Sequence, residues 1–326
     1  MKSVLVTGGT GFIGSHLIDA LLSKDYKIYC LVRNFNKLKW LEDKPVEFIK
    51  SDLNSSNIIL PEVDYVYHLA GLTKARRKKE FYRVNYLGTK NLISAVRKLK
   101  KLPKGFFLLS TLAVNGNLTS YKIISEEPAS PESHYAKSKW LAEQEILKYK
   151  DIINTVIIRP TIVYGPRDKD LYCYFKLIKK NKVAPIFNKN AIFSFLYITD
   201  LINMLLLLLE REVPSGQIFL MSDGNGYKWS DIIENVSSTL GIEVRAIRTI
   251  MIPDFLVYLS AMFYSIINYV KREPFILTID KLKEIFKKGW FCDIKEVRKI
   301  LRYDPEYDLL RGFQLTFEWY KTNRWL

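Results

Sequence analysis

The sequence of 326 residues contains only three cysteines and three histidines. The cysteines, Cys30, Cys173 and Cys292, lie far apart and form no C-x-x-C pair. This spacing argues against a disulfide framework and against a structural zinc site, and it fits a reducing compartment. We therefore expect no metal site and no thiol-based scaffold.

The sequence also lacks an export signal and a long apolar run. Its apolar start is too short for a signal peptide, and cleavage would fall inside a glycine motif at residues 7–14. Residues 255–270 carry no formal charge, but a spanning helix needs about 20 apolar residues. Weakly polar residues recur there at helical spacing, so we predict a buried or dimer-facing helix; the alternative, which we do not favour, is an interfacial membrane helix. We expect a cytoplasmic protein.

Acidic residues are outnumbered by basic ones. The chain has 50 lysines and arginines against 34 aspartates and glutamates, a net charge of +16. Such a surface can attract nucleic acid, an acidic membrane or phosphorylated substrates, but no nucleic-acid-binding motif accompanies it. We therefore expect a small-molecule substrate and no nucleic acid. The basic run 74–79 is either a solvated loop or a collector of an acidic substrate, carrier protein or lipid headgroup.

Short β-branched runs alternate with helical patterns in the first half of the chain. The patterns predict strands at 4–7, 27–32, 46–49, 65–69, 105–109 and 155–158, and helices at 12–23, 81–99 and 134–148. This alternation predicts an α/β fold with a Rossmann-like doubly wound parallel sheet. After residue 160 prolines interrupt the pattern, and the tail from 225 onward has a mostly helical pattern. We predict an NAD(P)-binding domain at 1–165, with a returning segment near 195–212, and a smaller, mostly helical substrate-binding lobe at 166–326.

Three glycines follow the first predicted strand. Gly8, Gly11 and Gly14 recur every three residues and open the first helix. This spacing lets the chain turn tightly, lets the backbone approach a pyrophosphate and lets the helix pack on the strand, while the helix N-terminus supplies free N–H groups. We predict that this loop, with Phe12 and Ile13, binds the phosphates of a dinucleotide.

The end of the second predicted strand lacks the acidic residue that would bond the ribose 2′-hydroxyl of NAD. Arg33 stands there and can pair with a 2′-phosphate, while Lys37 and Lys39 add positive charge nearby. The sequence therefore favours NADP as the cofactor. The alternative is that Arg33 stacks on the adenine and that either NADP or NAD binds.

Tyr135 and Lys139 lie four residues apart in a helical segment and so share one face. A free tyrosine has a pKa of about 10, too high for a base at neutral pH. A neighbouring ammonium and a cationic nicotinamide both lower that pKa. We predict that Tyr135 exchanges a proton with the substrate oxygen as hydride moves, that Lys139 supports it and anchors the ribose, and that Thr111 hydrogen-bonds the same oxygen.

The order and spacing of motifs from residue 7 to residue 166 resemble the extended short-chain dehydrogenase/reductase family, which includes nucleotide-sugar epimerases and dehydratases. The matching segments are 7–14, 52–53, 68–71, 84–89, 110–111, 135–139 and 159–166. The resemblance implies that Asp52 contacts the adenine, that Pro160 and Val163 lie beside the nicotinamide, and that the protein is a homodimer. It also implies that five further residues help to bind the cofactor: Leu53, Leu69, Ala70, Gly71 and Asn85.

Several positions depart from the family pattern. Dehydratases of the family carry Asp-Glu directly after the catalytic threonine; Leu112 and Ala113 stand here, so we do not expect dehydration. Many nucleotide-sugar enzymes place an arginine before a late strand to hold the substrate diphosphate, and Ser194 takes that position. The stretch around it looks more like the branch that acts on steroids, flavonols or other carbonyl compounds. Asn115 replaces a common tyrosine and either alters the pocket wall or satisfies a turn.

Three functions stay open at this stage. The first is an NADP-preferring reductase or dehydrogenase that acts on a hydroxyl or carbonyl of a medium-sized substrate. The second is a nucleotide-sugar 4-epimerase with tightly bound NAD, which uses the same Thr111, Tyr135 and Lys139. The third is a non-catalytic NADP sensor or scaffold, against which the intact catalytic residues argue. We assign His68, at a strand end, to packing.

Overall fold

The computed structural model describes residues 1–116, 123, 128–186, 188–253 and 289–326. The helix predicted at 255–270 lies outside the described residues. The chain divides into two compact units. The first contains residues 1–116, 129–159 and 202–219, and the second contains residues 117–128, 160–201 and 220–326. The functional assignment of residues 166–326 as a substrate-binding lobe stays a prediction.

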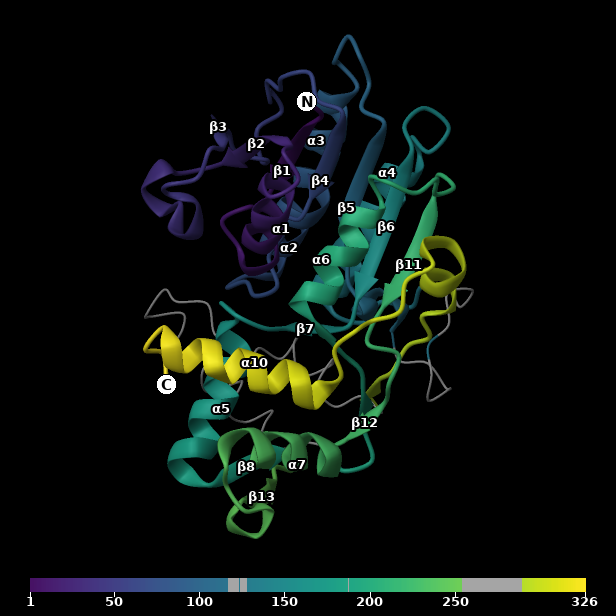
Figure 1. The fold of residues 1–326 in the computed structure, drawn as a ribbon. Coiled ribbons are helices and arrows are strands. Elements are labelled where there is room, and N and C mark those ends of the chain that lie inside the picture. The colour runs from purple at the N-terminus through teal and green to yellow at the C-terminus, as the bar shows by residue number, and fades with distance from the viewer. Residues whose placement is uncertain (117–122, 124–127, 187, 254–288) are drawn as a thin grey trace. The chain divides into compact units, whose positions relative to one another are not determined.

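A seven-stranded sheet forms the centre of the first unit, in the order β11-β6-β5-β4-β1-β2-β3 (Figure 1). The pairs from β3 across to β6 all run parallel, which confirms the predicted parallel, Rossmann-like sheet. All six predicted strands form, with small differences at their ends. The six are β1 (Ser3–Thr7), β2 (Lys27–Val32), β3 (Glu47–Lys50), β4 (Tyr65–His68), β5 (Gly105–Leu109) and β6 (Thr155–Pro160). The seventh strand, β11 (Gln217–Met221), was not predicted.

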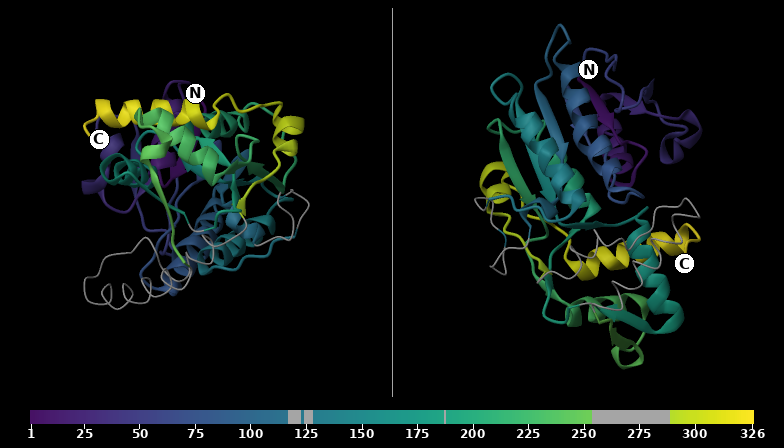
Figure 2. Two further views of the ribbon diagram at one scale, coloured as in Figure 1. Left: turned by 90° about the horizontal axis from the view of Figure 1, so that it is seen from below. Right: turned by 180° about the vertical axis from the view of Figure 1, so that it is seen from behind.

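Helices cover both faces of this sheet (Figures 1 and 2). One face carries α1 (Phe12–Leu22) and α6 (Ile198–Leu207), and the other carries α3 (Gly88–Val96) and α4 (His134–Leu147). Because the strand order changes direction between β1 and β4, the carboxyl ends of these two strands are the expected position for a nucleotide.

The segment predicted as one helix at 81–99 is not regular throughout. It consists of α2 (Lys78–Phe81), a π-helical stretch Tyr82–Leu87 and α3. Single π-turns within helices are frequent at functional positions, and this one contains Asn85. The hydrophobic period continues through the irregular turn, which is why the sequence pattern did not reveal it.

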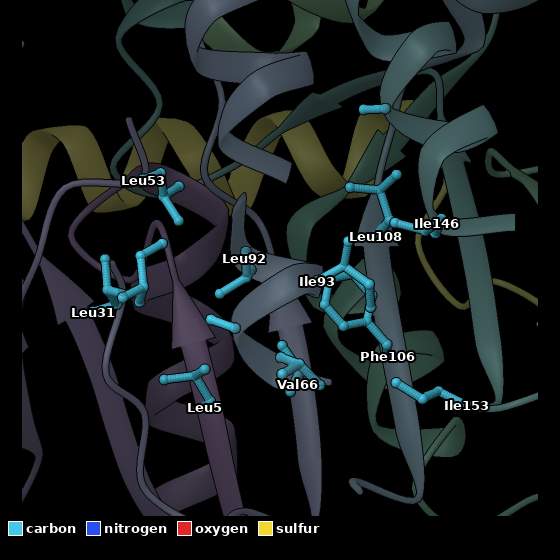
Figure 3. Packing of buried hydrophobic residues seen from close by; sticks show 14 of the residues in the cluster. Leu5, Leu31, Leu53, Val66, Leu92, Ile93, Phe106, Leu108, Ile146 and Ile153 are labelled. Atoms are coloured by element: carbon cyan, nitrogen blue, oxygen red, sulfur yellow. The ribbon is translucent and has the colours of Figure 1, made fainter. Parts of the chain in front are cut away.

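Apolar side chains of the inner strands pack against α3 and α4 (Figure 3). The packed residues include Leu5, Val66, Phe106 and Leu108 from the strands and Leu92, Ile93, Ala142 and Ile146 from the helices, all of them fully buried. Truncating one large side chain in such a core costs about 2–5 kcal/mol. This layer therefore fixes the ends of β1, β4 and β5, from which the candidate site is built.

The second unit contains short strands and helices. β7 (Ile162–Tyr164) pairs with β10 (Phe195–Tyr197), and β8 (Val183–Ile186) pairs with β13 (Arg248–Met251). A third sheet has the order β12-β9-β14. The remaining elements are β9 (Ile192–Phe193), β12 (Tyr227–Lys228), β14 (Gly289–Trp290), α5 (Lys169–Asn181), α7 (Trp229–Leu240) and α10 (Leu309–Thr322).

An aromatic cluster forms the core of this second unit. Tyr164 contacts Phe195 and Phe313 edge to face, and Phe313 contacts Phe175 in the same way. The tail beyond residue 225 contains helices, as predicted, but also the strands β12, β13 and β14. Strands of two to four residues are too short for a readable alternation of apolar and polar side chains, so the sequence did not indicate them.

All three cysteines are free thiols. Among the described residues, no helix is long and apolar enough to cross a membrane, and no group of side chains has the composition of a metal site.

Candidate active site

The glycine loop joins β1 to α1 and lies against the loop that follows β4. Gly8 has a φ of +76°, a conformation that favours glycine. A Cβ on Gly8 would lie 2.6 Å from the backbone nitrogen of Ala70, and one on Gly14 would collide with the carbonyl oxygen of Gly8. Glycine is therefore required at both positions by close backbone approach.

The N-terminus of α1 is open to an anion. Gly11 caps the helix and donates its N–H to the Gly8 carbonyl at 3.0 Å. No side chain among the described residues caps this end, and the first turn contains no acidic residue. The N–H groups of the first turn, which includes Phe12 and Ile13, therefore present a positive helix end that fits a pyrophosphate.

The loop after β4 is fixed to the end of β1. The Leu69 N–H donates to the Thr7 carbonyl oxygen at 3.1 Å, and the Ala70 N–H donates to Thr7 Oγ1 at 3.2 Å. These bonds hold the two loops together at the point where the strand order reverses. The fold thus places Gly8 and the 69–71 segment where a dinucleotide is expected.

Asn85 connects this loop to α4. Its Oδ1 accepts the Leu72 N–H at 2.7 Å, and its Nδ2 donates to the Leu72 carbonyl and to Ser138 Oγ at 3.1 and 2.9 Å. A Cβ on Gly71 would lie 3.2 Å from Asn85 Oδ1 and 3.6 Å from Lys139 Nζ. The structure therefore brings Gly71, Asn85 and Lys139 together, and the missing side chain of Gly71 leaves room beside the ammonium.

Arg33 and Asp52 leave the sheet at the same edge, because β2 and β3 are parallel and Val32 lies opposite Lys50. Both side chains are exposed, as are Lys37 and Lys39 in two short 3-10 turns (Phe35–Lys37 and Lys39–Leu41). The Asp52 carboxylate accepts the Asn54 N–H at 2.9 Å, and Leu53 beneath it is buried. This edge of the sheet thus carries the exposed basic residues Arg33, Lys37 and Lys39 after β2 and the exposed carboxylate of Asp52 after β3.

Lys139 is buried, and its ammonium donates to the carbonyl oxygen of Leu109, at the end of β5, at 2.5 Å. Burial lowers the pKa of Lys139 to about 8, against the opposing effect of the nearby Glu143 carboxylate. At neutral pH the side chain therefore still carries its charge, held at the strand end that leads to Thr111.

Tyr135 lies in the first turn of α4, where Ser133 caps the helix by accepting the Ala136 N–H at 2.9 Å. Its half-buried ring packs against Phe81 of α2, with ring centroids 5.9 Å apart. The i, i+4 spacing places Tyr135 and Lys139 on one side of the helix, as expected.

Thr111 follows β5 directly. Its Oγ1 accepts the Ala113 N–H at 3.2 Å and so caps the 3-10 turn Leu112–Asn115. Because the hydroxyl uses only an acceptor site in this bond, its proton can still be donated to a substrate oxygen. The two residues that replace the acid pair of dehydratases, Leu112 and Ala113, are buried in this turn.

A buried polar network joins α4 to the ends of β5 and β6. Arg159 donates through Nε and Nη2 to the Glu143 carboxylate at 3.0 and 2.6 Å, and through Nη1 to Asn115 Oδ1 at 3.0 Å. Ser110 Oγ also donates to the Glu143 carboxylate. Neither interpretation of Asn115 from the sequence included this role. Glu143 is not among the predicted site residues, although Glu143 follows Lys139 by four residues and so lies on the same helix face.

Two histidines near the site have structural partners. His68 is buried between Thr7, at 2.6 Å, and Thr89, at 2.8 Å, and burial lowers its pKa to about 3. A histidine that stays neutral in this way fits the packing role expected for it. His134 Nδ1 lies 2.8 Å from the Tyr82 hydroxyl, a pairing across 52 positions that no local pattern predicts.

The basic run 74–79 leads from the cofactor loop into α2. Ala75 is buried and anchors the loop, while Arg77, Lys78 and Lys79 are exposed. The next residues of α2 end at Phe81, which contacts Tyr135. The run therefore leads into a helix, α2, that contacts α4 through Phe81 and Tyr135.

Three predicted residues belong to the second unit. Pro160 ends β6 and Val163 lies in β7, and their place beside a nicotinamide stays a prediction. Ser194 is fully buried, and its Oγ donates to the Asn225 carbonyl at 2.7 Å. Ser194, which stands where many nucleotide-sugar enzymes of the family have the arginine, thus donates its hydroxyl proton to a carbonyl within this unit.

The fold is a doubly wound sheet with a glycine loop at its switch point. Thr111 follows the strand β5, and Tyr135 and Lys139 lie in the helix α4. This arrangement defines an enzyme that uses a nicotinamide dinucleotide. The sequence model of the NAD dependent epimerase/dehydratase family matches residues 4–221, and the chain belongs to this family. This confirms the resemblance drawn from the motifs.

Individual relatives cover nearly the whole chain. A ceramide reductase from Caulobacter vibrioides is 26% identical over 328 residues, 99% of this chain and 96% of the relative. A UDP-glucose 4-epimerase from Vibrio cholerae is 28% identical over 335 residues, 97% and 94% of the two chains. The crystal structure of UDP-glucose 4-epimerase from Thermotoga maritima with UDP-glucose has a TM-score of 0.80 at 19% identity and 99% coverage of both chains, a likeness of fold. The protein is therefore an NAD(P)-dependent oxidoreductase or epimerase of this family.

Proposed function

We propose that the protein is an NADP-preferring reductase or dehydrogenase acting on a hydroxyl/carbonyl pair of a medium-sized, largely apolar substrate. The observation that carries this choice is Ser194, which stands where many nucleotide-sugar enzymes of the family hold a diphosphate-binding arginine. Ser194 is uncharged, buried and bonded to the Asn225 carbonyl, so it cannot neutralise a diphosphate. Similarity to a ceramide reductase over 99% of the chain supports an apolar substrate.

The nicotinamide cofactor, when bound, supplies or accepts the hydride. Thr111 donates a hydrogen bond to the substrate oxygen, and Tyr135 gives that oxygen a proton during reduction or takes it during oxidation. The Lys139 ammonium favours the phenolate form of Tyr135, and Asn85 holds the loop beside it in place. Thr111, Tyr135 and Lys139 are our proposed catalytic set.

The catalytic set is tested with a panel of apolar ketones and NADPH, followed by loss of NADPH absorbance. Tyr135→Phe removes the proton donor and keeps the ring that packs on Phe81. We expect it to lower kcat by about 100-fold or more, because general acid catalysis contributes that much, and to leave the affinity for NADPH unchanged. Unchanged turnover in this variant would remove Tyr135 from the mechanism.

Our proposal of NADP rests on Arg33, with Lys37 and Lys39 beside it and no acidic residue at the strand end. A charge-assisted bond of about 1.5–3 kcal/mol corresponds to roughly 10- to 100-fold in affinity. Calorimetric titration should show that Arg33→Ala weakens NADP binding by such a factor and leaves NAD binding nearly unchanged. Equal loss for both cofactors would mean that Arg33 stacks on the adenine instead.

A nucleotide-sugar 4-epimerase is the second candidate, and the 28% identity to a UDP-glucose 4-epimerase over 97% of the chain favours it. Incubation with UDP-glucose and no added cofactor separates the two functions. The reductase proposal predicts no epimer and oxidation of NADPH by ketones. Formation of UDP-galactose that disappears in Tyr135→Phe would instead establish the epimerase.

We also propose that the protein is a cytoplasmic homodimer, from the scattered free cysteines and the resemblance to dimeric relatives. Sedimentation velocity of the purified protein tests the dimer.

A further inference from the structure

The surface around β8 and β13 in the second unit is apolar and basic at once. Large apolar side chains there are exposed: Val244 to 49%, Ile250 to 37% and Met251 to 57%. All four residues of β13, Arg248–Met251, are exposed, so this strand is an edge on which both faces reach solvent. Clustered exposed aliphatic side chains mark a contact surface more often than isolated ones do.

The register of the two strands shows which side is open. In a parallel pair, residues at the same register point to the same side, and residues two apart on a strand share a side. Arg248 and Ile250 therefore project beside Val183 and Pro185, which are only half-buried. On the opposite side β8 contributes Ala184 and Ile186, which are buried. The side with Ile250 is thus an apolar face bordered by a guanidinium.

Basic residues stand next to β8 and β13 in the chain. Lys180 and Lys182 at the end of α5, Arg245 in the 3-10 turn Val244–Ala246, and Arg248 are all exposed. Arg248 is next to Lys182 in space, because its N–H donates to the Lys182 carbonyl at 2.7 Å. Glu243 is the single carboxylate in residues 179–186 and 243–252. The face is therefore strongly positive.

We propose that this β8–β13 surface, with Val244, Ile250 and the four cations, lies against an anionic lipid bilayer. Aliphatic side chains enter the headgroup boundary while lysine and arginine side chains reach the phosphates. Charge decides against a second copy of the chain on this face, because two copies would bring like charges together. An anionic bilayer, by contrast, attracts each basic residue near its surface. This binding site is separate from the proposed catalytic residues, all of which lie in the first unit.

The test is co-sedimentation of the full-length protein with phosphatidylcholine vesicles, with and without phosphatidylglycerol. We expect binding only to the anionic vesicles, weakened by high salt. Arg245→Glu with Arg248→Glu should lower the partition coefficient by about thirtyfold or more, since each cation near an anionic surface contributes about fivefold. Val244→Ser with Ile250→Ser should weaken binding and keep its salt dependence.

The matched control is Lys90→Glu with Lys98→Glu, two exposed lysines of the first unit that change the net charge equally. Circular dichroism and sedimentation velocity accompany every variant. No binding by the unaltered protein, or equal loss in the control, would overturn the proposal. So would a change of oligomeric state in Val244→Ser with Ile250→Ser, since the surface would then be an interface between copies.

Discussion

Removing the charge of Glu143 is expected to lower the free energy of unfolding and to lower the pKa of Lys139. The carboxylate accepts two hydrogen bonds from Arg159 and one from Ser110, and neither member of the ion pair exceeds 4% exposure. In Glu143→Gln the amide nitrogen faces a donor, and the guanidinium keeps its charge without a counter-ion. A buried charge left in this state is the costly outcome.

The expected loss is about 3–5 kcal/mol, the range for breaking one partner of a buried ion pair. At about 2–4 °C per kcal/mol for a domain of this size, the melting temperature falls by roughly 6–20 °C. Differential scanning calorimetry measures it. Glu145→Gln is the control on the same helix, because Glu145 is also buried but its partner Lys148 is 62% exposed, so that the ammonium left behind stays hydrated.

The double variant Glu143→Leu with Arg159→Leu separates the cost of an unpaired charge from the value of the pair. Apolar replacement of both partners is often neutral, so the double variant should melt above Glu143→Gln. A folded Glu143→Gln protein that melts together with Glu145→Gln would refute the reasoning. In activity, loss of the carboxylate should lower the pKa of Lys139 further and move the alkaline limb of the rate profile to lower pH.

Two further predictions follow from buried ionisable groups. Burial lowers the pKa of Lys139 from 10.5 to about 8, so the unfolded chain binds more protons between these values and stability rises with pH across them. Lys139→Met should therefore stabilise the inactive protein at neutral pH, by about 3 kcal/mol, and flatten that rise; a lower melting temperature would contradict this. Burial lowers the pKa of His68 from 6.5 to about 3, so stability falls as pH drops below 6.5, by about 1.4 kcal/mol per pH unit. His68→Asn should remove this slope in urea titrations at successive pH values; an unchanged slope would assign the acid sensitivity to other groups.

The inner strands of the parallel sheet could be predicted from the sequence because they are buried on both faces. Such strands are short apolar runs between turns, and β5 has the bounds that the pattern predicted, as does the partly buried β2. The glycine loop, Tyr135 and Lys139 could also be predicted, because their spacing is local and carries its own physical reason.

Contacts across long stretches of sequence could not be predicted. Ser110 meets Glu143 across 33 positions, and Asn115 meets Arg159 across 44. Each of these residues has an ordinary role when considered alone: a strand end, a helix face, a turn. Only the fold brings them into one network. The β8–β13 surface could not be predicted either, because its two strands are too short for their pattern to be recognised.

The surroundings of Lys139 lead to one more prediction. An ammonium has three protons to donate, and among the described residues its hydrogen-bond acceptor is the Leu109 carbonyl. The remaining protons lie beside the space left open by Gly71, where ribose hydroxyls of the proposed cofactor would accept them. New acceptors favour the charged form and raise the pKa of Lys139 from about 8.

Binding of NADPH should therefore take up protons at mildly alkaline pH, because part of the lysine population is neutral before binding. Calorimetry in buffers of different ionisation enthalpy measures this uptake directly. Lys139→Met should abolish it, while Arg33→Ala should weaken binding and leave the uptake per bound molecule unchanged, since the uptake is assigned to Lys139. Uptake that persists in Lys139→Met would mean that a different group titrates on binding, and the role of Lys139 at the ribose would have to be abandoned.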